Sequence, residues 1–542
     1  MAGAAPVKRA AALVLSAALI FAALILPNFP GNMNWGALQR WPLELPVILL
    51  SLAALGWRRG VPHLVALLLT VGVVLKLADY ATFEAYNRPA NPVLDLYLIQ
   101  PAFSLMSDTL GPVPAAAALA LLIVAPVAVF WAFLWAARRW AALGLTGPIR
   151  HIAGVLALLG AGWAAADAGH HLGAWKLTAS PPGTAYTSRV IVRRSTQALD
   201  VAPDLIAFRQ AAAADPFAGR TGLLDGLDGR DVLLIWVESY GRASFDNPLY
   251  SETHTETLCQ AQAALDARGM QMRSGWLTAP TAGGQSWLSH ATLATGLWTT
   301  DQARYAALIA AGPSWLFHIA REAGYRTAAV MPAITQPWPE ADAMGFDIVL
   351  NADAMGYRGD RFRWVTMPDQ FTLSAYAARL PPDPRPDFVQ IALISSHAPW
   401  TPIADVVPWK DVGDGTVFNP MAVRGPTPKD LWDDRADVRE AYRRSVDYAL
   451  EVVFSHVARL EDAPLVIVLG DHQSAPFVAG SDSRDVAAHI IGPAEALARI
   501  EGWGWTPGLV PSADVPARRM DAFKGDFIEA FTVPINALSL GQ

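Results

Sequence analysis

Three apolar segments of this sequence each end in side chains that can bind a metal ion or move a proton. The segment "DVLLIWV" is followed by Glu238, and "FVQIALISS" is followed by His397. The segment "PLVIVLG" is followed by Asp471 and His472. A single Asp in such a place usually caps a helix. Three cases together favour a joint site, because carboxylates and imidazoles are ligands for Mn²⁺, Mg²⁺ or Zn²⁺.

A fourth segment, "TAPTAGGQSWLSHATLATG", offers a nucleophile. Ser286 follows two glycines at the predicted start of a helix, where backbone N–H groups favour an anion such as phosphate. A metal ion that coordinates the hydroxyl would stabilise its alkoxide for attack on phosphorus. Ser286 as a simple helix cap and Thr281 as the nucleophile are the alternatives. His397 could bind or protonate the leaving group.

These residues need elements that bring distant parts of the chain together. From about residue 228, short apolar runs alternate with helical patterns, of which "ADVREAYRRSVDYALEVVFSHVARLED" is the longest. Continuous apolar strands separated by helices predict an α/β domain with a central, mostly parallel sheet over residues 228–542. Ligands of such sheets bind beyond the carboxyl ends of the strands. The candidate metal ligands all fall at such ends.

The first third of the chain has the composition of a membrane domain. The whole sequence is 53% hydrophobic and only 16% charged. A spanning helix needs about 20 apolar residues, and residues 1–170 contain five candidate segments that reach this length with their flanks. The predicted spans are about 10–27, 42–57, 61–80, 114–137 and 150–168. The segment 42–57 is the shortest of the five.

Basic residues predict the orientation of this bundle of about five transmembrane helices. They precede the first span and lie between spans two and three and between spans four and five: Lys8, Arg9, Arg58, Arg59, Arg138, Arg139 and Arg150. With five spans, all of these fall on one side, which the positive-inside rule makes cytoplasmic. We therefore expect a multi-pass protein of the bacterial inner membrane, with residues 228–542 periplasmic or extracellular.

Polar residues near the outer end of the third span, and others after the fifth span, allow two interpretations each. Lys76 and Asp79 could pair or reach the interface, or they could serve near a lipid substrate. Residues 171–227, predicted as linker and juxtamembrane helices, carry Arg189, Arg193 and Arg194 among apolar residues. This stretch could lie on the membrane surface or be a plain linker helix.

The segments "LLIWVESYG", "GGQSW", "SSHAPW" and "GDHQ" resemble the alkaline phosphatase–sulfatase superfamily. They look most like its lipoteichoic acid synthase and phosphoglycerol transferase branch, in which membrane spans precede an extracytoplasmic domain. The resemblance covers about residues 228–534. It implies that Glu238, Asp471 and His472 are metal ligands and that Ser286 is the covalent nucleophile and fourth ligand. His397 would contact the substrate phosphate or head group.

The resemblance also implies further substrate-binding positions: Gly284, and the basic residues Arg361 and Arg363, which could equally be ordinary surface arginines. The sequence departs from the branch in one respect, because the transferases usually carry threonine where Ser286 stands. The sulfatase signature is absent around Ser286. His489 could support a second metal ion, although a structural histidine is the competing interpretation.

We therefore expect a membrane-anchored, metal-dependent phosphotransferase with one divalent ion, Mn²⁺ before Mg²⁺ or Zn²⁺. It would move a phosphoglycerol-like or phosphoethanolamine-like head group from a membrane phospholipid to a glycan or polymer. A phosphodiesterase, phosphatase or sulfatase-like hydrolase with the same site is the first alternative. A non-catalytic lipid- or glycan-binding membrane protein is the second.

Other classes lack support in the sequence. No GxxxxGK, HExxH or GxSxG motif is present, which leaves nucleotide hydrolysis, zincin proteolysis and α/β-hydrolase chemistry without a signature. A formal net charge of −7 and no basic tract give no sign of nucleic-acid binding. Cys259 is the single cysteine, so neither an intramolecular disulfide nor a cysteine-rich zinc site can form.

Overall fold

The computed structural model describes residues 4–30, 41–177 and 182–533. The chain forms two compact units. The first unit comprises Met1–Glu84 and Arg88–Ala202, and the second comprises Ala85–Asn87 and Pro203–Gln542. The main boundary falls within a helix that contains Pro203. This boundary lies inside the segment 171–227 that was predicted as a linker.

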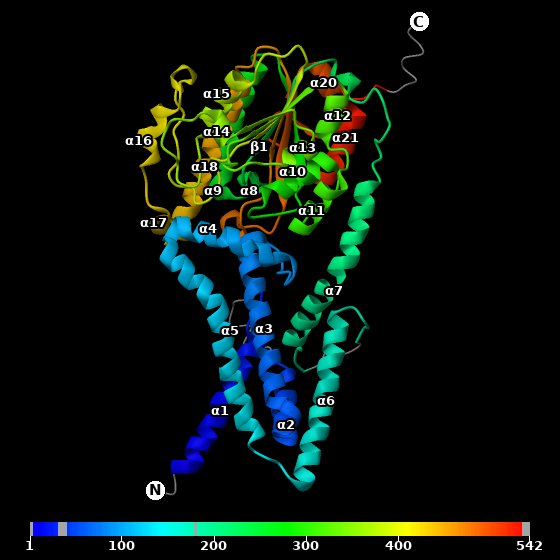
Figure 1. Ribbon diagram of the computed structural model, residues 1–542, viewed down its shortest axis with the longest axis vertical. Helices are drawn as coiled ribbons and strands as arrows, with labels where there is room; N and C mark the ends of the chain where they lie inside the picture. The colour runs from blue at the N-terminus through cyan, green and yellow to red at the C-terminus, as the bar shows by residue number, and fades with distance from the viewer. Residues whose placement is uncertain (1–3, 31–40, 178–181, 534–542) are drawn as a thin grey trace. The chain divides into compact units, whose positions relative to one another are not determined.

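The first unit is built from helices (Figure 1). Its helices are α1 (Ala4–Ile25), α2 (Glu44–Leu55), α3 (Val61–Tyr86), α4 (Ile99–Leu110), α5 (Pro112–Ala141), α6 (Gly147–His171) and the first part of α7 (Tyr186–Ala213). Short 3-10 turns at Arg58–Gly60 and Leu94–Leu98 connect some of them.

Four helices of the described chain are long and apolar enough to cross a membrane, by length and composition: Val7–Ile25, Val61–Tyr86, Pro112–Ala141 and Gly147–His171. The fifth candidate, α2, is apolar but only 12 residues long. Exposed apolar side chains run along α5, including Leu121, Leu122 and Ile123. A surface of this kind suits contact with lipid chains rather than water. The unit thus contains four to five apolar helices, as predicted.

The second unit contains a nine-stranded sheet in the described residues, with the order β4-β3-β5-β1-β6-β7-β2-β8 and with β9 beside β2. The strands are β1 (Val232–Val237), β2 (Gln271–Thr278), β3 (Arg326–Met331), β4 (Ile348–Asn351), β5 (Asp387–Ala392), β6 (Leu465–Gly470), β7 (Asp485–Gly492), β8 (Thr506–Pro507) and β9 (Arg518–Arg519). Strands β4, β3, β5, β1 and β6 are parallel, whereas β7 pairs antiparallel with both β6 and β2. The predicted mostly parallel sheet is confirmed.

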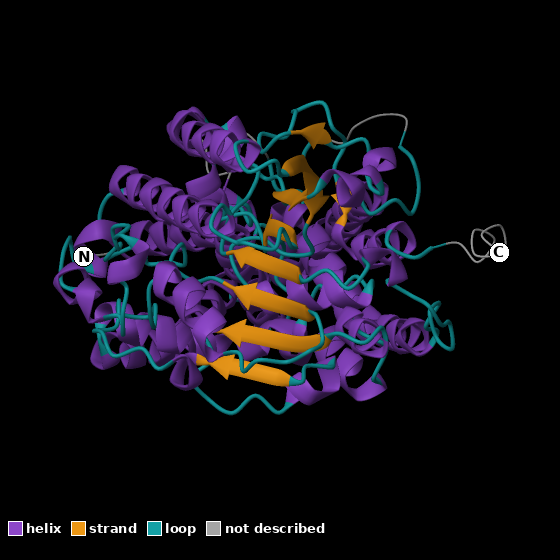
Figure 2. Cartoon of the chain, turned by 90° about the horizontal axis from the view of Figure 1, so that it is seen from above, coloured by secondary structure: helices purple, strands orange, loops and turns teal. Residues whose placement is uncertain are grey.

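Helices cover both faces of this sheet, as Figure 2 shows from above. They are α8 (Ala243–Asp246), α9 (Pro248–Asp266), α10 (Ser286–Thr295), α11 (Gln302–Ala311), α12 (Leu316–Glu322), α13 (Glu340–Met344), α14 (Ala352–Met355), α15 (Asp369–Arg379), α16 (Asn419–Ala422), α17 (Pro428–Trp432), α18 (Arg435–Val457), α19 (Pro476–Ala479), α20 (Ala494–Ala498) and α21 (Phe523–Ala530). The predicted long helix is α18.

The apolar runs are continuous because each central strand is buried on both faces. In β1, Leu233, Ile235 and Val237 join one core, which contains much of α18. The alternate residues Leu234 and Trp236 join the second core, which contains α12 and α21. The two cores fix the register of β1 and β6, and therefore fix which residues emerge at their carboxyl ends.

Candidate active site and metal centre

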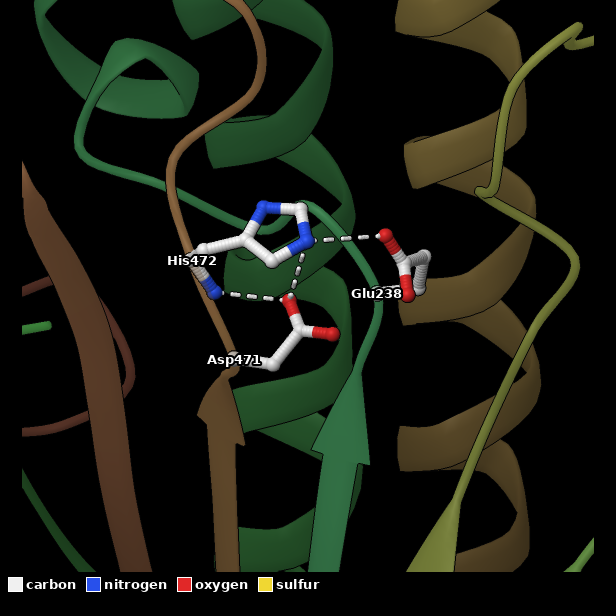
Figure 3. A group of neighbouring side chains, drawn as sticks. All are labelled: Glu238, Asp471 and His472. Carbon is white, nitrogen blue, oxygen red and sulfur yellow. Dashed lines mark hydrogen bonds and ion pairs between the residues drawn. The ribbon is translucent and has the colours of Figure 1, made fainter. Parts of the chain in front are cut away.

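The candidate metal ligands lie at the ends of two neighbouring parallel strands (Figure 3). Strand β1 pairs with β6 so that Val237 lies beside Gly470, the last residues of the two strands. Glu238 and Asp471 follow these residues directly, so their side chains emerge next to each other. His472 adds an imidazole, and ligand atoms of the three side chains lie within 4.8 Å of one another.

Hydrogen bonds hold the three buried side chains in place. Asp471 Oδ1 accepts from the backbone N–H of Ser239 at 2.8 Å and of His472 at 2.7 Å. The Ser239 hydroxyl donates to Glu238 Oε1 at 2.9 Å. His472 Nε2 lies 3.1 Å from Glu238 Oε1 and 3.8 Å from Asp471 Oδ1. All three candidate ligands are buried.

The electrostatics of this group favour a cation. Burial raises the pKa of Asp471 to about 7, and the charge of Glu238 adds to the rise. Burial alone would lower the pKa of His472, but the charges of Asp471 and Glu238 outweigh it and raise that pKa to about 9. Burial also opposes ionisation of Glu238, yet His472 and His397 hold the pKa of Glu238 below its usual range.

The residues present fit a divalent ion. Two buried carboxylates face one imidazole, and within the described chain no lysine or arginine forms an ion pair with either carboxylate. The His472 Nδ1 atom lies 3.0 Å from the Gln473 carbonyl, which it can bond as N–H. That tautomer leaves the Nε2 lone pair facing Glu238 and Asp471, the arrangement that supports metal ligation by histidine. A proton bound at His472 Nε2 would supply a positive charge beside the same two carboxylates.

Ser286 begins α10 and reaches the same group. Its hydroxyl donates a hydrogen bond to Glu238 Oε2 at 3.0 Å, so Glu238 contacts both His472 and Ser286. Gln285 precedes the helix with φ of 68°, and no side chain caps the first N–H groups of α10. Leu288 N–H donates to the Gln285 carbonyl at 2.9 Å, so among the described hydrogen bonds the N–H groups of Ser286 and Trp287 remain to bind an anion such as phosphate beside the hydroxyl.

Thr281, the alternative nucleophile, has a different environment. Its hydroxyl lies 3.5 Å from the Ser289 hydroxyl. Within the described residues, no hydrogen bond joins Thr281 to Glu238, Asp471 or His472. The geometry therefore favours Ser286 over Thr281.

The loop before Ser286 is tied to the loop that carries His472. The backbone N–H of Gly283 donates to the Gln473 carbonyl at 2.7 Å, and Ala282 forms a bridge with Gln473. The same carbonyl lies beside His472 Nδ1. Gly283 has φ of +71°, a conformation that favours glycine. These backbone contacts place the loop that carries Ser286 beside Glu238, Asp471 and His472, the candidate metal group.

His397 comes from the loop after β5, the other neighbour of β1. The preceding Ser396 donates to the Glu238 backbone carbonyl at 2.7 Å, which joins this loop to the metal group. The Trp364 ring stacks on the His397 imidazole, with 3.7 Å between ring centroids and 18° between ring planes. His397 is half-buried. This placement suits a group that contacts substrate rather than the metal ion.

Three positions near the site were missed by the sequence interpretation. Trp364 stacks on His397 although the two residues are far apart in the sequence, so no local sequence pattern reveals the contact. Asp369 is buried, and its Oδ1 accepts from the N–H groups of Ile394 and Ser395 at 2.9 Å each, which holds the loop that carries His397. Burial raises the pKa of Asp369 to about 6.

The third missed position is His290, one helical turn after Ser286. It is half-buried and packs against Trp236, with ring centroids 4.4 Å apart. Burial lowers its pKa to about 3, so the ring is neutral, and it interacts with the charges of Glu238 and His472. The spacing of four residues from Ser286 on a helix was the signal that could have found it.

The remaining predicted residues are less tied to the group. Arg361 and Arg363 are exposed, and Arg363, with φ of 60°, directly precedes the Trp364 ring. Gly284 has φ of 141°, which only glycine adopts freely.

His489 has both ring nitrogens occupied, by the Ser274 hydroxyl at 2.8 Å and the Tyr240 hydroxyl at 3.1 Å. This supports the structural interpretation of His489.

Residues 230–489 match the family model of the sulfatases. The match covers the α/β domain from the start of β1 into β7, including every residue of the metal group and the Ser286 loop. The matched α/β domain therefore belongs to the sulfatase/alkaline phosphatase superfamily. Comparison with curated protein sequences found no significant match.

Several solved structures are similar to the chain at low identity. One is the lipoteichoic acid synthase LtaP from Listeria monocytogenes, with 12% identity and a TM-score of 0.38, covering 60% of this chain and 78% of that one. Another is the lipooligosaccharide phosphoethanolamine transferase EptA from Neisseria meningitidis, with 14% identity and a TM-score of 0.47, covering 96% and 95%. A third is the phosphoglycerol transferase GacH from Streptococcus pyogenes, with 11% identity and a TM-score of 0.37, covering 62% and 81%.

Proposed function

We propose that this protein is a membrane-anchored phosphotransferase that moves a phospho-head-group from a membrane phospholipid to an extracytoplasmic glycan or polymer. The observation that carries the proposal is the 3.0 Å hydrogen bond from Ser286 to Glu238, within a buried carboxylate and imidazole group. The apolar helices support a lipid donor, because catalyst and donor then share one membrane and meet at a high effective concentration.

Glu238, Asp471 and His472, with Ser286 as a fourth ligand, would hold one divalent ion, for which Mn²⁺ is our first expectation and Mg²⁺ and Zn²⁺ are alternatives. When bound, such an ion lowers the pKa of a coordinated hydroxyl and withdraws charge from phosphoryl oxygens. The remaining steps belong to residues of the chain itself.

In the first half-reaction, the Ser286 oxygen attacks the lipid phosphorus. The bond from phosphorus to the diacylglycerol oxygen breaks as the bond from Ser286 to phosphorus forms. The hydroxyl proton has an acceptor in Glu238 Oε2, to which it already bonds. The N–H groups at the start of α10 can stabilise the phosphoryl oxygens. His397 would give the departing diacylglycerol oxygen its proton.

In the second half-reaction, an acceptor hydroxyl attacks the phosphorus and gives its proton to His397. The bond from phosphorus to Ser286 breaks, and Ser286 takes its proton back from Glu238. Arg361, Arg363 and Gly284 are proposed to contact the head group or the acceptor. Water in place of the acceptor would make the protein a hydrolase. We also propose that the α/β domain lies on the periplasmic or outer side of a bacterial inner membrane, which is where such acceptors occur.

The test uses full-length protein in detergent with Mn²⁺ and phosphatidylglycerol labelled in the head group. Release of diacylglycerol, with label transferred to an added glycan, supports the transferase. Release of free glycerol phosphate at the same rate with and without glycan would show a hydrolase instead. Ser286→Ala should abolish diacylglycerol release, whereas Thr281→Ala, the matched control, should retain it. Full activity in Ser286→Ala would refute the proposed site.

A further inference from the structure

A cavity of about 250 Å³ lies in the first unit, at the start of α7. The described residues that line it are Asn28, Tyr186, Arg189, Val190, Arg193 and Arg194. The five residues from α7 recur at intervals of three and four, so they form one face of that helix. Three of them are arginines, so the described lining of this cavity is basic.

Two of the three guanidinium groups are available to a ligand. Arg194 is committed, because its Nε and Nη2 atoms bond the buried Asp79 carboxylate at 2.8 and 3.0 Å. Arg193 is exposed, and no hydrogen bond or ion pair to another described residue holds its side chain. Arg189 donates to the Thr184 hydroxyl at 3.3 Å, while its Nε is buried without a hydrogen bond and lies 3.8 Å from Asp167.

The wall behind these arginines is fixed by a polar network. Asn28 donates to Asp79 Oδ2 at 2.6 Å and also bonds the Tyr186 hydroxyl. Lys76 is buried beside the Tyr186 ring and donates to the carbonyls of Ala23 and Leu24 at 3.0 and 2.9 Å. A rigid, hydrogen-bonded wall lowers the cost of ordering the site when an anion binds.

The carboxylates around the cavity do not neutralise it. Asp79 is paired with Arg194. Asp167 accepts from the Ala185 N–H at 2.7 Å and lies 3.3 Å from His171, so Arg189 shares it with two other groups. Glu44 accepts from the Ser188 N–H at 3.0 Å. Arg193 has no such partner, which leaves positive charge at the surface of the cavity.

The surroundings point to a lipid as the source of the anion. Asn28 lies three residues after the end of the apolar helix α1, and Asp167 lies near the end of α6, so the cavity is at the level where head groups begin. Val192 and Leu199, one heptad apart on α7, are 42% and 76% exposed. Exposed apolar side chains on the same helix as the basic cavity match a molecule with acyl chains and a charged head.

We propose that this cavity binds the phosphate group of a membrane lipid head group, with Arg189 and Arg193 as its anion ligands. The bidentate geometry of guanidinium suits phosphate oxygens. The site is formed by residues of the first unit alone, whereas the metal group belongs to the second unit. It is therefore independent of the proposed reaction, and it can be tested without turnover.

The test titrates full-length protein in detergent with phosphatidylglycerol and follows bound lipid by native mass spectrometry. A galactosyl diacylglycerol with the same chains but no phosphate is titrated in parallel, and inorganic phosphate is added as a competitor. Arg193→Gln is the main variant, because its side chain has no described partner to lose. Arg189→Gln is the second. Arg209→Gln, an exposed arginine on the same helix, is the matched control.

We expect either cavity variant to bind phosphatidylglycerol at its tightest site roughly 10-fold or more weakly than the unchanged protein. This is the effect of losing a charge-assisted hydrogen bond. Arg209→Gln should bind like the unchanged protein, and the galactolipid should bind weakly to all forms. Equal binding of the galactolipid, or an equal loss in Arg209→Gln, would overturn the proposal. Inorganic phosphate that binds as tightly as the phospholipid would also overturn it, because the ligand would then be the free ion.

Discussion

Replacing Glu238 by glutamine should separate metal binding from folding. The substitution keeps the shape of the side chain and the acceptor for Ser286 but removes one buried charge. Glu238 lies 3.1 Å from His472 Nε2, and its charge raises the pKa of Asp471. Without metal, Glu238→Gln relieves the repulsion between two buried carboxylates, so the free energy of unfolding should not fall by more than about 1 kcal/mol.

With metal present, the effect should be large. An ion at 100 times its Kd stabilises the folded state by about 2.7 kcal/mol. Loss of a second-sphere partner already weakens metal affinity by about 10- to 100-fold, so loss of a direct ligand should reach at least the upper value. The same Mn²⁺ concentration then equals about one Kd of the variant. The stabilisation of the folded state by the ion falls to about 0.4 kcal/mol.

The assay is denaturant unfolding of full-length protein in detergent, with and without Mn²⁺, supported by calorimetric titration of the metal. Glu252→Gln, an exposed change of the same kind on α9, is the control and should keep the full metal effect. If Glu238→Gln kept the full stabilisation by Mn²⁺, the proposed ligand set would be wrong. If it unfolded the protein even without metal, the role of Glu238 would be structural.

Three further predictions follow from single features of the structure. Cys259 is the single cysteine and is exposed, so a membrane-impermeant maleimide should label it in spheroplasts without lysis; labelling only after lysis would reverse the proposed topology. Protons compete with the metal, because the metal-free pKa is raised to about 7 for Asp471 and about 9 for His472. Mn²⁺ affinity should therefore rise with pH between about 6 and 9, with about one proton released per ion at pH 7.5 in calorimetry across buffers; no release would contradict this. Asp369→Ala should free the loop that carries His397 and lower kcat by roughly 10-fold, whereas Asp369→Asn, which keeps an acceptor oxygen, should stay within about 3-fold; equal losses would refute the positioning role.

Strand type and strand ends were predictable because both faces of the sheet are covered. The apolar runs before Glu238, His397 and Asp471 are the strands β1, β5 and β6, as predicted. The order of the strands was not predictable, because apolar runs carry no information about their neighbours. The pairing of β1 with both β5 and β6 is what brings the three ends together.

Residues that act through long-range packing were not predictable from local patterns. The stack of Trp364 on His397 depends on where two loops meet. The structural role of His489 depends on its register with Ser274 across β2 and β7. In the membrane unit, apolar composition predicted the long helices, but it did not predict that residues from the start of α7 line a cavity with Asn28.

The most direct test of the central claim is to identify the residue that carries the covalent intermediate. Full-length protein is incubated with Mn²⁺ and phosphatidylglycerol, quenched in acid, digested and sequenced by tandem mass spectrometry. The structure predicts a phosphoglycerol adduct on Ser286, formed together with diacylglycerol and absent in Ser286→Ala. An adduct on Thr281, or turnover of lipid by Ser286→Ala at the unchanged rate, would contradict the assignment of Ser286 as the nucleophile held against Glu238.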